Sequence, residues 1–334
     1  MSPAEGEPPV TKPVLLLTRK LPQAVEARAA RDYDARLNTE DAPWARDGAE
    51  IARRATAAGA AGILCAAGDP MNAATFAALP DSVRIVATFS VGTDHIDLAA
   101  AKARGIVVTN TPDVLSFATA EIAMTLMLMA ARRAGEGERM VRARAWTGWT
   151  PTQLMGTTLE GKALGIAGFG RIGRELAKMA RGFGMPIHYR NRTRLTSDLE
   201  MGATYHDNDA SFLGVIDVLS MHMPGGEATR KWLNAERIAM MKPGAIVVNS
   251  GRGTSVDDAA LVAALQSGRL AAAGLDVYDG EPRVFEGYFG LENVALLPHL
   301  GSATVETRDA MGFRALDNLD ALLRAGHEPP HRVA

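Results

Sequence analysis

The sequence predicts an α/β protein of two doubly wound, parallel-sheet domains, with the active site in the cleft between them. The chain has 334 residues, enough for two domains of ordinary size. Short apolar runs alternate with longer amphipathic segments, and this alternation occurs in two consecutive series. A glycine-rich strand-to-helix turn opens the second series. Alternating strands and helices are typical of a parallel sheet covered on both faces.

The first series contains four candidate strands. They are Val14–Thr18, Gly62–Ala66, Arg84–Ser90 and Gly105–Asn110. Helical spacing between them includes Asp47–Ala58 and Asn72–Leu79. The segment before this series is polar and rich in proline, so we expect residues 1–11 to be a disordered tail and not a secretory signal.

The second series contains six candidate strands and ends in a long helix. The strands are Ala163–Gly168, Pro186–Arg190, Asp217–His222, Ala245–Ser250, Leu270–Val277 and Val294–Pro298. Helices are expected at Arg171–Arg181 and Asp257–Ser267, and a final one from about Val305 to Arg324.

Composition narrows the class of protein. Hydrophobic residues make up 47% and charged residues 22%, as in globular proteins. The net charge of −2 favours neither nucleic acid nor an anionic membrane as partner. The apolar run Ile122–Ala131 is shorter than the roughly 20 residues that span a bilayer. The single cysteine, Cys65, excludes an intramolecular disulfide and is expected in the core. We therefore expect a soluble, cytoplasmic protein.

The glycine-rich turn predicts a dinucleotide site. Gly168, Gly170 and Gly173 have G-x-G-x-x-G spacing between an apolar strand and a helix. The first glycine permits the tight turn, the second allows a pyrophosphate to approach, and the third lets the helix pack closely. The first helical residues, Arg171 and Ile172, would then present free N–H groups to the phosphates. An ordinary tight strand–helix turn is the alternative.

Three polar side chains follow later strands and are candidates for catalysis. Arg252, Glu281 and His299 each come just after an apolar run. Ligands of open α/β sheets bind at the carboxyl ends of strands, so these residues could converge. Arginine can bind a carboxylate in a forked manner, and histidine can exchange a proton near neutral pH. Taken singly, each could instead be a solvated or capping residue. No pattern indicates a metal site.

The stretch "YRNRTR" predicts which dinucleotide is bound. It lies roughly 20 residues after the glycine-rich turn, where NAD-binding sites carry an acidic residue for the ribose 2′-hydroxyl. This stretch instead offers Asn191, Arg192, Thr193 and Arg194, which can donate hydrogen bonds and positive charge to a 2′-phosphate. We therefore expect NADPH to be preferred over NADH. A solvated basic turn is the alternative.

At this point the sequence resembles the D-2-hydroxyacid dehydrogenases, in particular the glyoxylate/hydroxypyruvate reductases. The resembling stretches are "SVGTDHIDLAAAKARGIVVTNTPDVL", "GFGRIGRELAKMARGFGM", "MMKPGAIVVNSGRGTSVDDAALVAAL", "AGLDVYDGEP" and "LLPHLGSAT". The resemblance implies two Rossmann-like domains: a discontinuous substrate-binding domain, 12–111 plus 302–334, and an NAD(P)-binding domain, 112–301. It also implies a homodimer.

The resemblance assigns roles to particular residues. It makes Arg252, Glu281 and His299 the catalytic set, with Arg252 and His299 also binding substrate. It places the substrate carboxylate on the backbone amides of Val91 and Gly92. It implies that Asp276 contacts the nicotinamide carboxamide.

The resemblance implies NADPH-dependent reduction of small 2-oxo acids, glyoxylate to glycolate and hydroxypyruvate to D-glycerate. Thr93 and Phe117 depart from residues common in relatives, which leaves substrate size open. A dehydrogenase for phosphoglycerate or a bulkier acid is one alternative, and a non-catalytic nucleotide-sensing module is another. Trp146 or Trp149 could reach a partner's active site or simply pack in a dimer arm.

Overall fold

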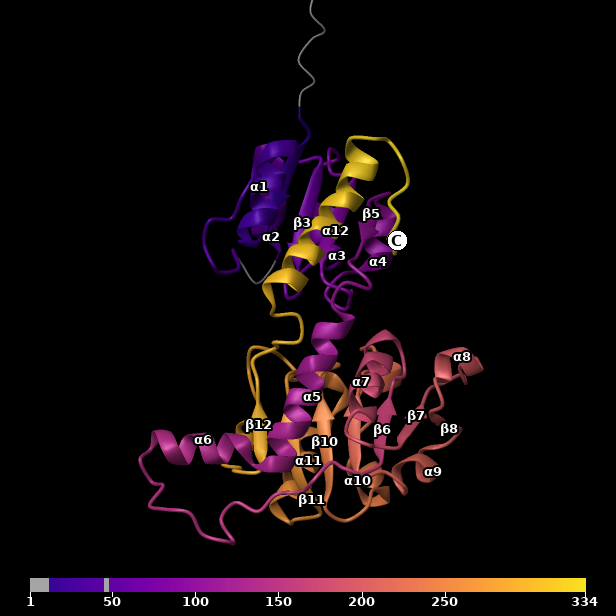
Figure 1. Ribbon diagram of the computed structural model, residues 1–334. Helices are drawn as coiled ribbons and strands as arrows, with labels where there is room; N and C mark the ends of the chain where they lie inside the picture. The colour runs from indigo at the N-terminus through magenta and orange to yellow at the C-terminus, as the bar shows by residue number, and fades with distance from the viewer. Residues whose placement is uncertain (1–11, 45–47) are drawn as a thin grey trace, which may run out of the picture. The chain divides into compact units, whose positions relative to one another are not determined.

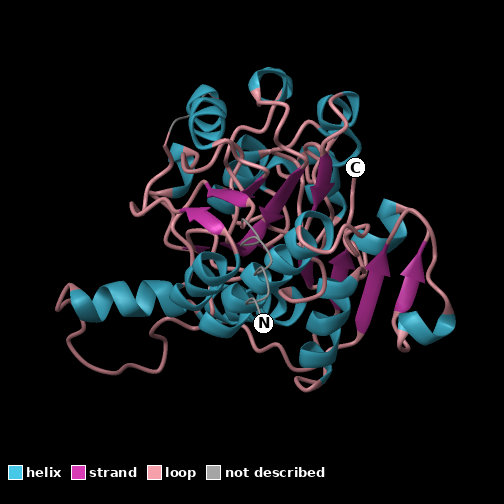
Figure 2. Ribbon diagram, turned by 90° about the horizontal axis from the view of Figure 1, so that it is seen from above, coloured by secondary structure: helices cyan, strands magenta, loops and turns pink. Residues whose placement is uncertain are grey.

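The computed structural model describes residues 12–44 and 48–334, which form two compact units (Figure 1). Unit 1 comprises the described residues up to Val114 together with Thr304–Ala334, and unit 2 comprises Leu115–Ala303. The tail expected at residues 1–11 lies outside the described residues. Figure 2 shows strands flanked by helices throughout the chain. The expectation of two parallel-sheet α/β domains is confirmed.

Unit 1 contains a five-stranded parallel sheet of order β2-β1-β3-β4-β5. Its strands are β1 (Val14–Leu17), β2 (Asp34–Arg36), β3 (Gly62–Ala66), β4 (Ile85–Phe89) and β5 (Val107–Thr109). Its helices are α1 (Gln23–Asp32), α2 (Ala49–Ala58), α3 (Ala73–Ala78), α4 (Leu98–Ala103) and α12 (Val305–Leu323).

Successive side chains of the unit 1 strands point to opposite faces and build two cores. Leu16 packs in a cluster with residues of α2, α3 and α4, whereas Leu15 and Leu17 pack with α1 and α12. This arrangement buries α12, the last helix of the chain, against the first strands. Cys65 is fully buried in the first cluster, as expected.

Unit 2 contains a seven-stranded parallel sheet of order β12-β11-β10-β9-β6-β7-β8. Its strands are β6 (Leu164–Ala167), β7 (Ile187–Arg190), β8 (Thr204–His206), β9 (Val218–Met221), β10 (Ala245–Asn249), β11 (Leu270–Leu275) and β12 (Val294–Leu296). Its α-helices are α5 (Ser116–Arg132), α6 (Ala134–Arg142), α7 (Arg171–Arg181), α8 (Ser197–Glu200), α9 (Asp209–Leu213), α10 (Ala235–Met240) and α11 (Asp258–Gln266). Short 3₁₀ turns are η1 (Glu227–Thr229), η2 (Gly253–Ser255) and η3 (Glu286–Tyr288).

The strand order of unit 2 reverses between β6 and β9. From β6 the chain proceeds outward through β7 and β8, and it then returns to β9 and proceeds to β12 on the other side. Residues of α5 and α7 cover one face of this sheet, and residues of α9, α10 and α11 cover the other. Such a reversal marks where ligands bind in doubly wound sheets, at the carboxyl ends of the strands.

Two strands of the structure were not predicted from the sequence. The short edge strands β2 and β8 contain polar residues and no continuous apolar run. Each has only one neighbour in its sheet. An edge strand is partly solvated, so it need not carry the apolar signature of a central strand.

The segment around α6 exposes several large apolar side chains. Figure 1 shows α6 and the following loop extending from the body of unit 2. Val141, Trp146, Trp149 and Met155 are all more than half exposed on it. Within the residues that the structure describes, no helix combines the length and the apolar character needed to cross a membrane.

Candidate active site

The three predicted catalytic residues follow strands that are neighbours in the unit 2 sheet. Arg252 follows β10, Glu281 follows β11 and His299 follows β12. The order β12-β11-β10 places these parallel strands side by side. Their carboxyl ends therefore meet at one edge of the sheet, where the three side chains can act on one ligand.

His299 and Glu281 form a hydrogen-bonded pair. The distance between His299 Nδ1 and Glu281 Oε2 is 2.7 Å. The other carboxylate oxygen accepts the Tyr278 amide at 2.9 Å, so the carboxylate is held by both oxygens. With Nδ1 donating to the carboxylate, Nε2 is the ring nitrogen left to exchange a proton with a ligand. The histidine side chain is 49% exposed, so a ligand can reach it.

The pair shifts the protonation of both groups. The hydrogen bond to Glu281 raises the pKa of His299 above its ordinary value, although burial acts in the opposite direction. Burial by itself would raise the pKa of Glu281. The hydrogen bond from His299 and the nearby charge of Arg252 help to outweigh burial, and the pKa of Glu281 is lowered. The site therefore favours an imidazolium beside a carboxylate.

Asp276 holds the backbone of the His299 turn. His299 has φ 55°, a left-handed conformation that costs energy for a residue other than glycine. The His299 amide donates to the Asp276 carbonyl at 2.9 Å. The Asp276 carboxylate accepts the amides of Leu300 at 2.6 Å and Gly301 at 2.8 Å. Asp276 is fully buried, and these three bonds fix the turn that presents His299.

Asn249 does the same for the Arg252 turn, and sequence reasoning missed it. Its Oδ1 accepts the Gly251 amide at 3.0 Å, and its Nδ2 donates to the Arg252 carbonyl at 2.9 Å. The Ser255 hydroxyl donates to the same carbonyl at 2.7 Å. Asn249 is fully buried at the end of β10. The sequence did offer a signal for this role, because Asn249 is the one polar residue of β10 and stands at its end.

The glycine-rich turn has the geometry that a dinucleotide requires. Gly168 has φ +92°, and a Cβ there would lie 2.8 Å from the His222 carbonyl carbon. A Cβ on Gly173 would lie 2.8 Å from the Gly168 oxygen. By contrast, a Cβ on Gly170 would meet nothing within 4 Å, so the space beside this residue is open. The first and third glycines are therefore needed for packing, and the second faces free space.

Behind this turn lies a neutral histidine. His222 Nε2 is 2.8 Å from the Ser220 hydroxyl, and its Nδ1 is 3.4 Å from the Ser250 hydroxyl. Burial lowers the pKa of His222 to about 4. His222 thus supports the turn as an uncharged packing residue.

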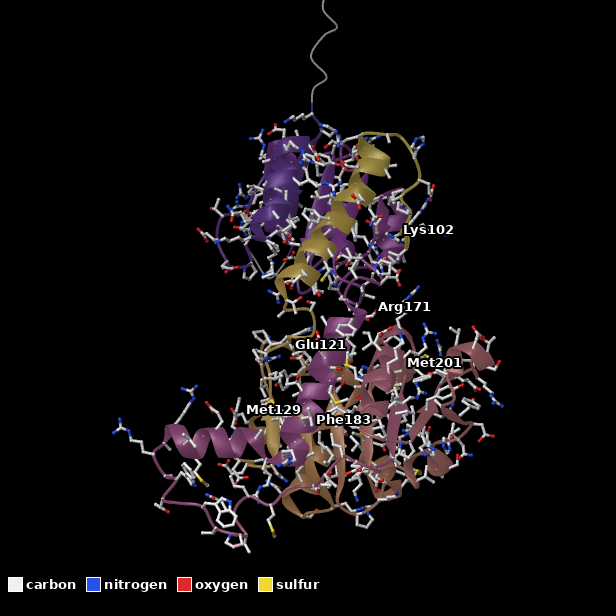
Figure 3. All side chains as sticks on the ribbon, in the orientation of Figure 1. Lys102, Glu121, Met129, Arg171, Phe183 and Met201 are labelled. Carbon is white, nitrogen blue, oxygen red and sulfur yellow. The ribbon has the colours of Figure 1, made fainter. Side chains whose placement is uncertain are left out.

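The helix after the turn begins where the phosphates are expected. Gly170 is the N-cap of α7, and Arg171 and Ile172 are its first residues. Figure 3 labels Arg171. No acidic residue lies in the first turn of α7. The N-terminus of this helix therefore has the positive partial charge that favours an anion, with no carboxylate in its own first turn to oppose it.

The end of β7 is linked to the glycine-rich turn through Asn191. Asn191 Oδ1 accepts the Phe169 amide at 2.7 Å, and the Gly168 amide donates to the Arg190 carbonyl at 3.0 Å. Since its oxygen is used here, Asn191 retains an NH₂ group that can donate to a ligand. An aspartate at this position would place a negative charge at the same turn.

The three arginines of the "YRNRTR" stretch differ in their side-chain partners. Arg190 pairs with Asp209 at 3.2 Å. Arg194 binds both oxygens of Glu200, at 2.7 and 3.2 Å. Among the described residues, Arg192 has neither a hydrogen bond nor an ion pair, and its side chain is exposed. Arg192 is thus the guanidinium of the three that is available to a ligand, with the exposed Thr193 beside it.

The predicted carboxylate-binding amides lie in unit 1, directly after β4. Val91 is 37% exposed. Neither the Val91 amide nor the Gly92 amide donates a hydrogen bond to any residue that the structure describes. Two neighbouring free N–H groups at the end of a parallel strand are suited to an anionic ligand.

Comparison with known proteins identifies the family. Residues 124–301 match the D-isomer specific 2-hydroxyacid dehydrogenase, NAD binding domain. The chain is 44% identical over 315 residues to the glycerate dehydrogenase of Hyphomicrobium methylovorum, which covers 94% of this chain and 97% of that protein. It is 45% identical over 256 residues to the glyoxylate reductase of Thermococcus litoralis, covering 75% and 77% of the two chains.

A solved structure extends the similarity to the whole fold. The NADPH-dependent glyoxylate/hydroxypyruvate reductase of Sinorhizobium meliloti, crystallised with NADP and malonate, aligns with a TM-score of 0.85 at 36% identity. That alignment covers 97% of each chain. With the family match and the strand-end residues Arg252, Glu281 and His299, these similarities lead to one conclusion: the chain belongs to the D-isomer specific 2-hydroxyacid dehydrogenase family.

Proposed function

We propose that the protein reduces small 2-oxo acids with NADPH, converting glyoxylate to glycolate and hydroxypyruvate to D-glycerate. The observation that carries this proposal is the hydrogen-bonded His299–Glu281 pair on strands adjacent to Arg252, in a unit with a dinucleotide-type turn. The test is a set of initial rates for glyoxylate, hydroxypyruvate and pyruvate, each with NADPH and with NADH. Activity only on a bulkier acid would select the alternative substrate class.

The side chains have distinct tasks in this proposal. The Val91 and Gly92 amides and the Arg252 guanidinium bind the substrate carboxylate, and Arg252 also polarises the carbonyl. His299, protonated, donates its Nε2 proton to the carbonyl oxygen. Glu281 stabilises the imidazolium before this transfer. In the oxidative direction neutral His299 accepts the proton.

The residues of unit 2 fit the cofactor. The open space at Gly170 and the helix start at Arg171 and Ile172 suit its pyrophosphate. Asn191, Arg192, Thr193 and Arg194 form the segment that we assign to the 2′-phosphate. Asp276 is assigned to the nicotinamide carboxamide. When bound, the nicotinamide supplies the hydride for C2 of the substrate.

Arg192→Ala should reduce kcat/KM for NADPH by about tenfold or more. A hydrogen bond to a charged group is worth roughly 1.5–3 kcal/mol, and NADH lacks the phosphate that would receive it. The measurement is kcat/KM for both cofactors in wild type and variant. An unchanged ratio of the two values would contradict the assignment.

Arg194→Ala is the matched comparison. Because Arg194 is paired with Glu200 in the structure, its loss could act on the loop instead of on the phosphate. Equal losses with NADPH and NADH would identify it as a support of the loop. A loss confined to NADPH would identify it as a second phosphate ligand.

Glu281→Gln should shift the falling limb of the reductive pH–rate profile to lower pH. The Glu281 hydrogen bond raises the pKa of His299, so protonated histidine persists to higher pH in the wild type. Glutamine can still accept a hydrogen bond but removes the charge. Activity should therefore be retained best at low pH and lost as pH rises. Glu286→Gln, at an exposed residue of η3, is the control and should leave the profile in place.

The second candidate function belongs to a different class: a nucleotide-sensing module that does not catalyse a reaction. It would bind NADPH without oxidising it in the presence of any 2-oxo acid. The paired His299 and Glu281 argue for turnover, since binding alone has no need of a raised histidine pKa.

We also propose that the protein is a cytoplasmic homodimer. The exposed Val141, Trp146, Trp149 and Met155 on and after α6 would be covered by a second copy. Sedimentation of the purified chain tests the dimer. The buried thiol of Cys65 is compatible with a reducing compartment.

A further inference from the structure

The loop after β4 contains Val91 and Gly92. It is hydrogen-bonded to the two residues that follow β5, Asn110 and Thr111. The Thr111 amide donates to the Ser90 carbonyl at 2.9 Å. Asn110 Nδ2 donates to the Val91 carbonyl at 2.9 Å. In a trans peptide, the carbonyl of one residue and the amide of the next lie in one plane and point in opposite directions. These two bonds therefore set the directions of the Val91 and Gly92 amides.

Of the two, the bond from Asn110 is made by a side chain and can be removed without changing the backbone. It alone holds the Val91 carbonyl among the described residues. The next peptide is held separately, because the Ser90 hydroxyl donates to the Gly92 carbonyl at 2.7 Å. Loss of the Asn110 amide group would thus free one peptide, the one that bears the Gly92 N–H.

The backbone of Asn110 is itself fixed by the C-terminal part of the chain. Its amide donates to the His331 carbonyl at 3.2 Å. Its carbonyl accepts Asn318 Nδ2 at 3.0 Å, and Asn318 Oδ1 accepts the His331 amide at 3.3 Å. Asn318 lies on α12 and is fully buried. One buried amide therefore joins α12, the C-terminal segment and Asn110.

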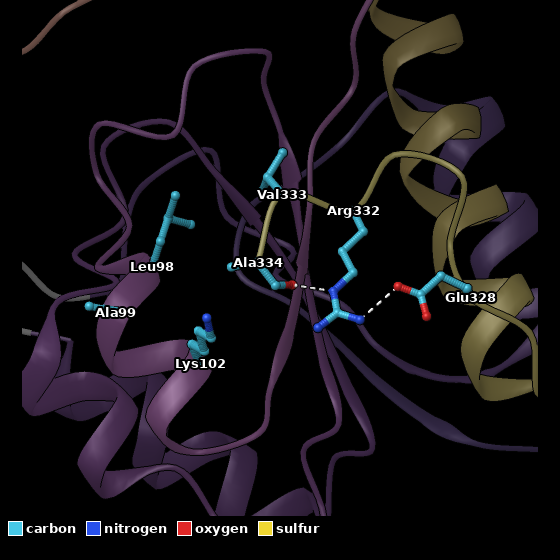
Figure 4. Close-up of a pocket in the computed structure, with 7 residues that line it drawn as sticks. All are labelled: Leu98, Ala99, Lys102, Glu328, Arg332, Val333 and Ala334. Carbon is cyan, nitrogen blue, oxygen red and sulfur yellow. Dashed lines mark hydrogen bonds and ion pairs between the residues drawn. The ribbon is translucent and has the colours of Figure 1, made fainter.

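The C-terminal segment, residues 331–334, is bound along the edge of β5. The Val108 amide donates to the Ala334 carbonyl at 2.9 Å, and the Val333 amide donates to the Val108 carbonyl at 2.8 Å. Thr109 and Arg332 form an antiparallel bridge. Figure 4 shows Arg332 bonded to both Glu328 and Ala334, beside a cavity of about 640 Å³ that also contacts Lys102 of α4. The segment thus covers the otherwise open edge of the sheet next to Asn110.

We propose that Asn110 is a positioning residue for substrate, which aims the Gly92 amide at the substrate carboxylate and is kept in place by Asn318 and the C-terminal segment. This inference rests on the proposed function, since it uses the Val91 and Gly92 amides as the carboxylate site. It adds a residue that touches neither substrate nor cofactor.

The central test is Asn110→Asp in the full chain. Aspartate has the same size and shape but has no N–H to donate, so packing is preserved. We expect KM for glyoxylate to rise about tenfold or more, as for the loss of one hydrogen bond to a charged group. We expect kcat to change by less than about twofold and KM for NADPH to stay unchanged, because neither the His299 pair nor the cofactor turn is altered. Asn110→Ala should raise KM in the same direction.

Two controls separate positioning from stability. Asn234→Asp makes the same chemical change at the N-cap of α10, where the side chain accepts a hydrogen bond from the Arg237 amide and donates none to the described residues, and it should leave KM unchanged. Lys102→Ala alters the cavity beside the C-terminal segment and should also leave KM unchanged. If both Asn110 variants retain the wild-type KM, the proposal is wrong. A parallel fall in thermal midpoint, kcat and both affinities would overturn it as well, since it would indicate a merely structural role.

The affinity for oxamate, an unreactive analogue of a 2-oxo acid, makes the test independent of turnover. Its dissociation constant from the NADPH complex should rise in Asn110→Asp as KM does. A wild type that binds oxamate but reduces no 2-oxo acid would contradict the proposed function and not this inference. Asn318→Ala alone should also raise KM with little change in kcat, because Asn318 holds the carbonyl of Asn110. An unchanged KM in Asn318→Ala would exclude a role for Asn318 in positioning Asn110.

Discussion

Replacing His299 should lower kcat for glyoxylate reduction by about 10²–10⁴-fold while leaving NADPH affinity close to the wild-type value. We assign His299 as the proton donor to the carbonyl oxygen, and its Nδ1 is already bonded to Glu281 at 2.7 Å. Among the residues between β12 and α12, His299 is the one whose side chain can donate a proton near neutral pH. The loss should therefore appear in kcat and not in cofactor binding.

The structure determines which substitution gives the cleanest result. Because His299 has φ 55°, alanine there would combine the chemical loss with backbone strain. Asparagine adopts this left-handed conformation more readily, so His299→Asn removes the proton donor with less disturbance of the turn. Comparing it with His299→Ala separates chemistry from strain. His327→Ala, at an exposed histidine, is the control. Retention of most of the wild-type kcat in His299→Asn would rule out the assigned role.

Arg252→Lys should raise KM for glyoxylate strongly and also lower kcat, although it keeps the positive charge. The guanidinium is planar and can contact the carboxylate and the carbonyl together, whereas an ammonium group acts as a point charge. Losing one charge-assisted hydrogen bond predicts about a tenfold or larger loss in kcat/KM, and losing polarisation of the carbonyl should add to it. Initial rates across a range of glyoxylate concentrations give both parameters.

The turn around Arg252 makes this a test of the side chain alone. Asn249 and Ser255 hold the Arg252 carbonyl, so the backbone should be unaffected by the substitution. Arg237→Lys, at a residue paired with Asp209, is the matched control and should keep the wild-type KM. A wild-type KM in Arg252→Lys would assign carboxylate binding wholly to the Val91 and Gly92 amides.

Much of the fold and of the chemistry could be predicted from local sequence. The central strands are continuous apolar runs because both of their faces are buried, and each predicted run overlaps a strand of the structure. Arg252, Glu281 and His299 could be grouped because parallel strands place their carboxyl ends at one edge of the sheet. The glycines of the turn are recognisable because only glycine permits the close contacts at Gly168 and Gly173.

Other features depend on which partner each polar group finds, and spacing along the chain does not encode this. Three arginines of similar appearance have different fates: Arg190 pairs with Asp209, Arg194 pairs with Glu200, and Arg192 is left available. A guanidinium can reach many carboxylates, so only the packing of α8 and α9 decided between them.

The sequence by itself determined the two parallel sheets, the glycine-rich turn and the strand-end positions of Arg252, Glu281 and His299, because each follows from burial or from a local steric requirement. Only the tertiary structure decided the edge strands β2 and β8, the left-handed turn at His299 and the hydrogen bonds that hold Asn110. Those bonds join Asn110 to Asn318 and to His331, both of which are far from Asn110 along the chain. These features arise from hydrogen bonds between distant segments, whose partners are selected when the sheets and helices pack together.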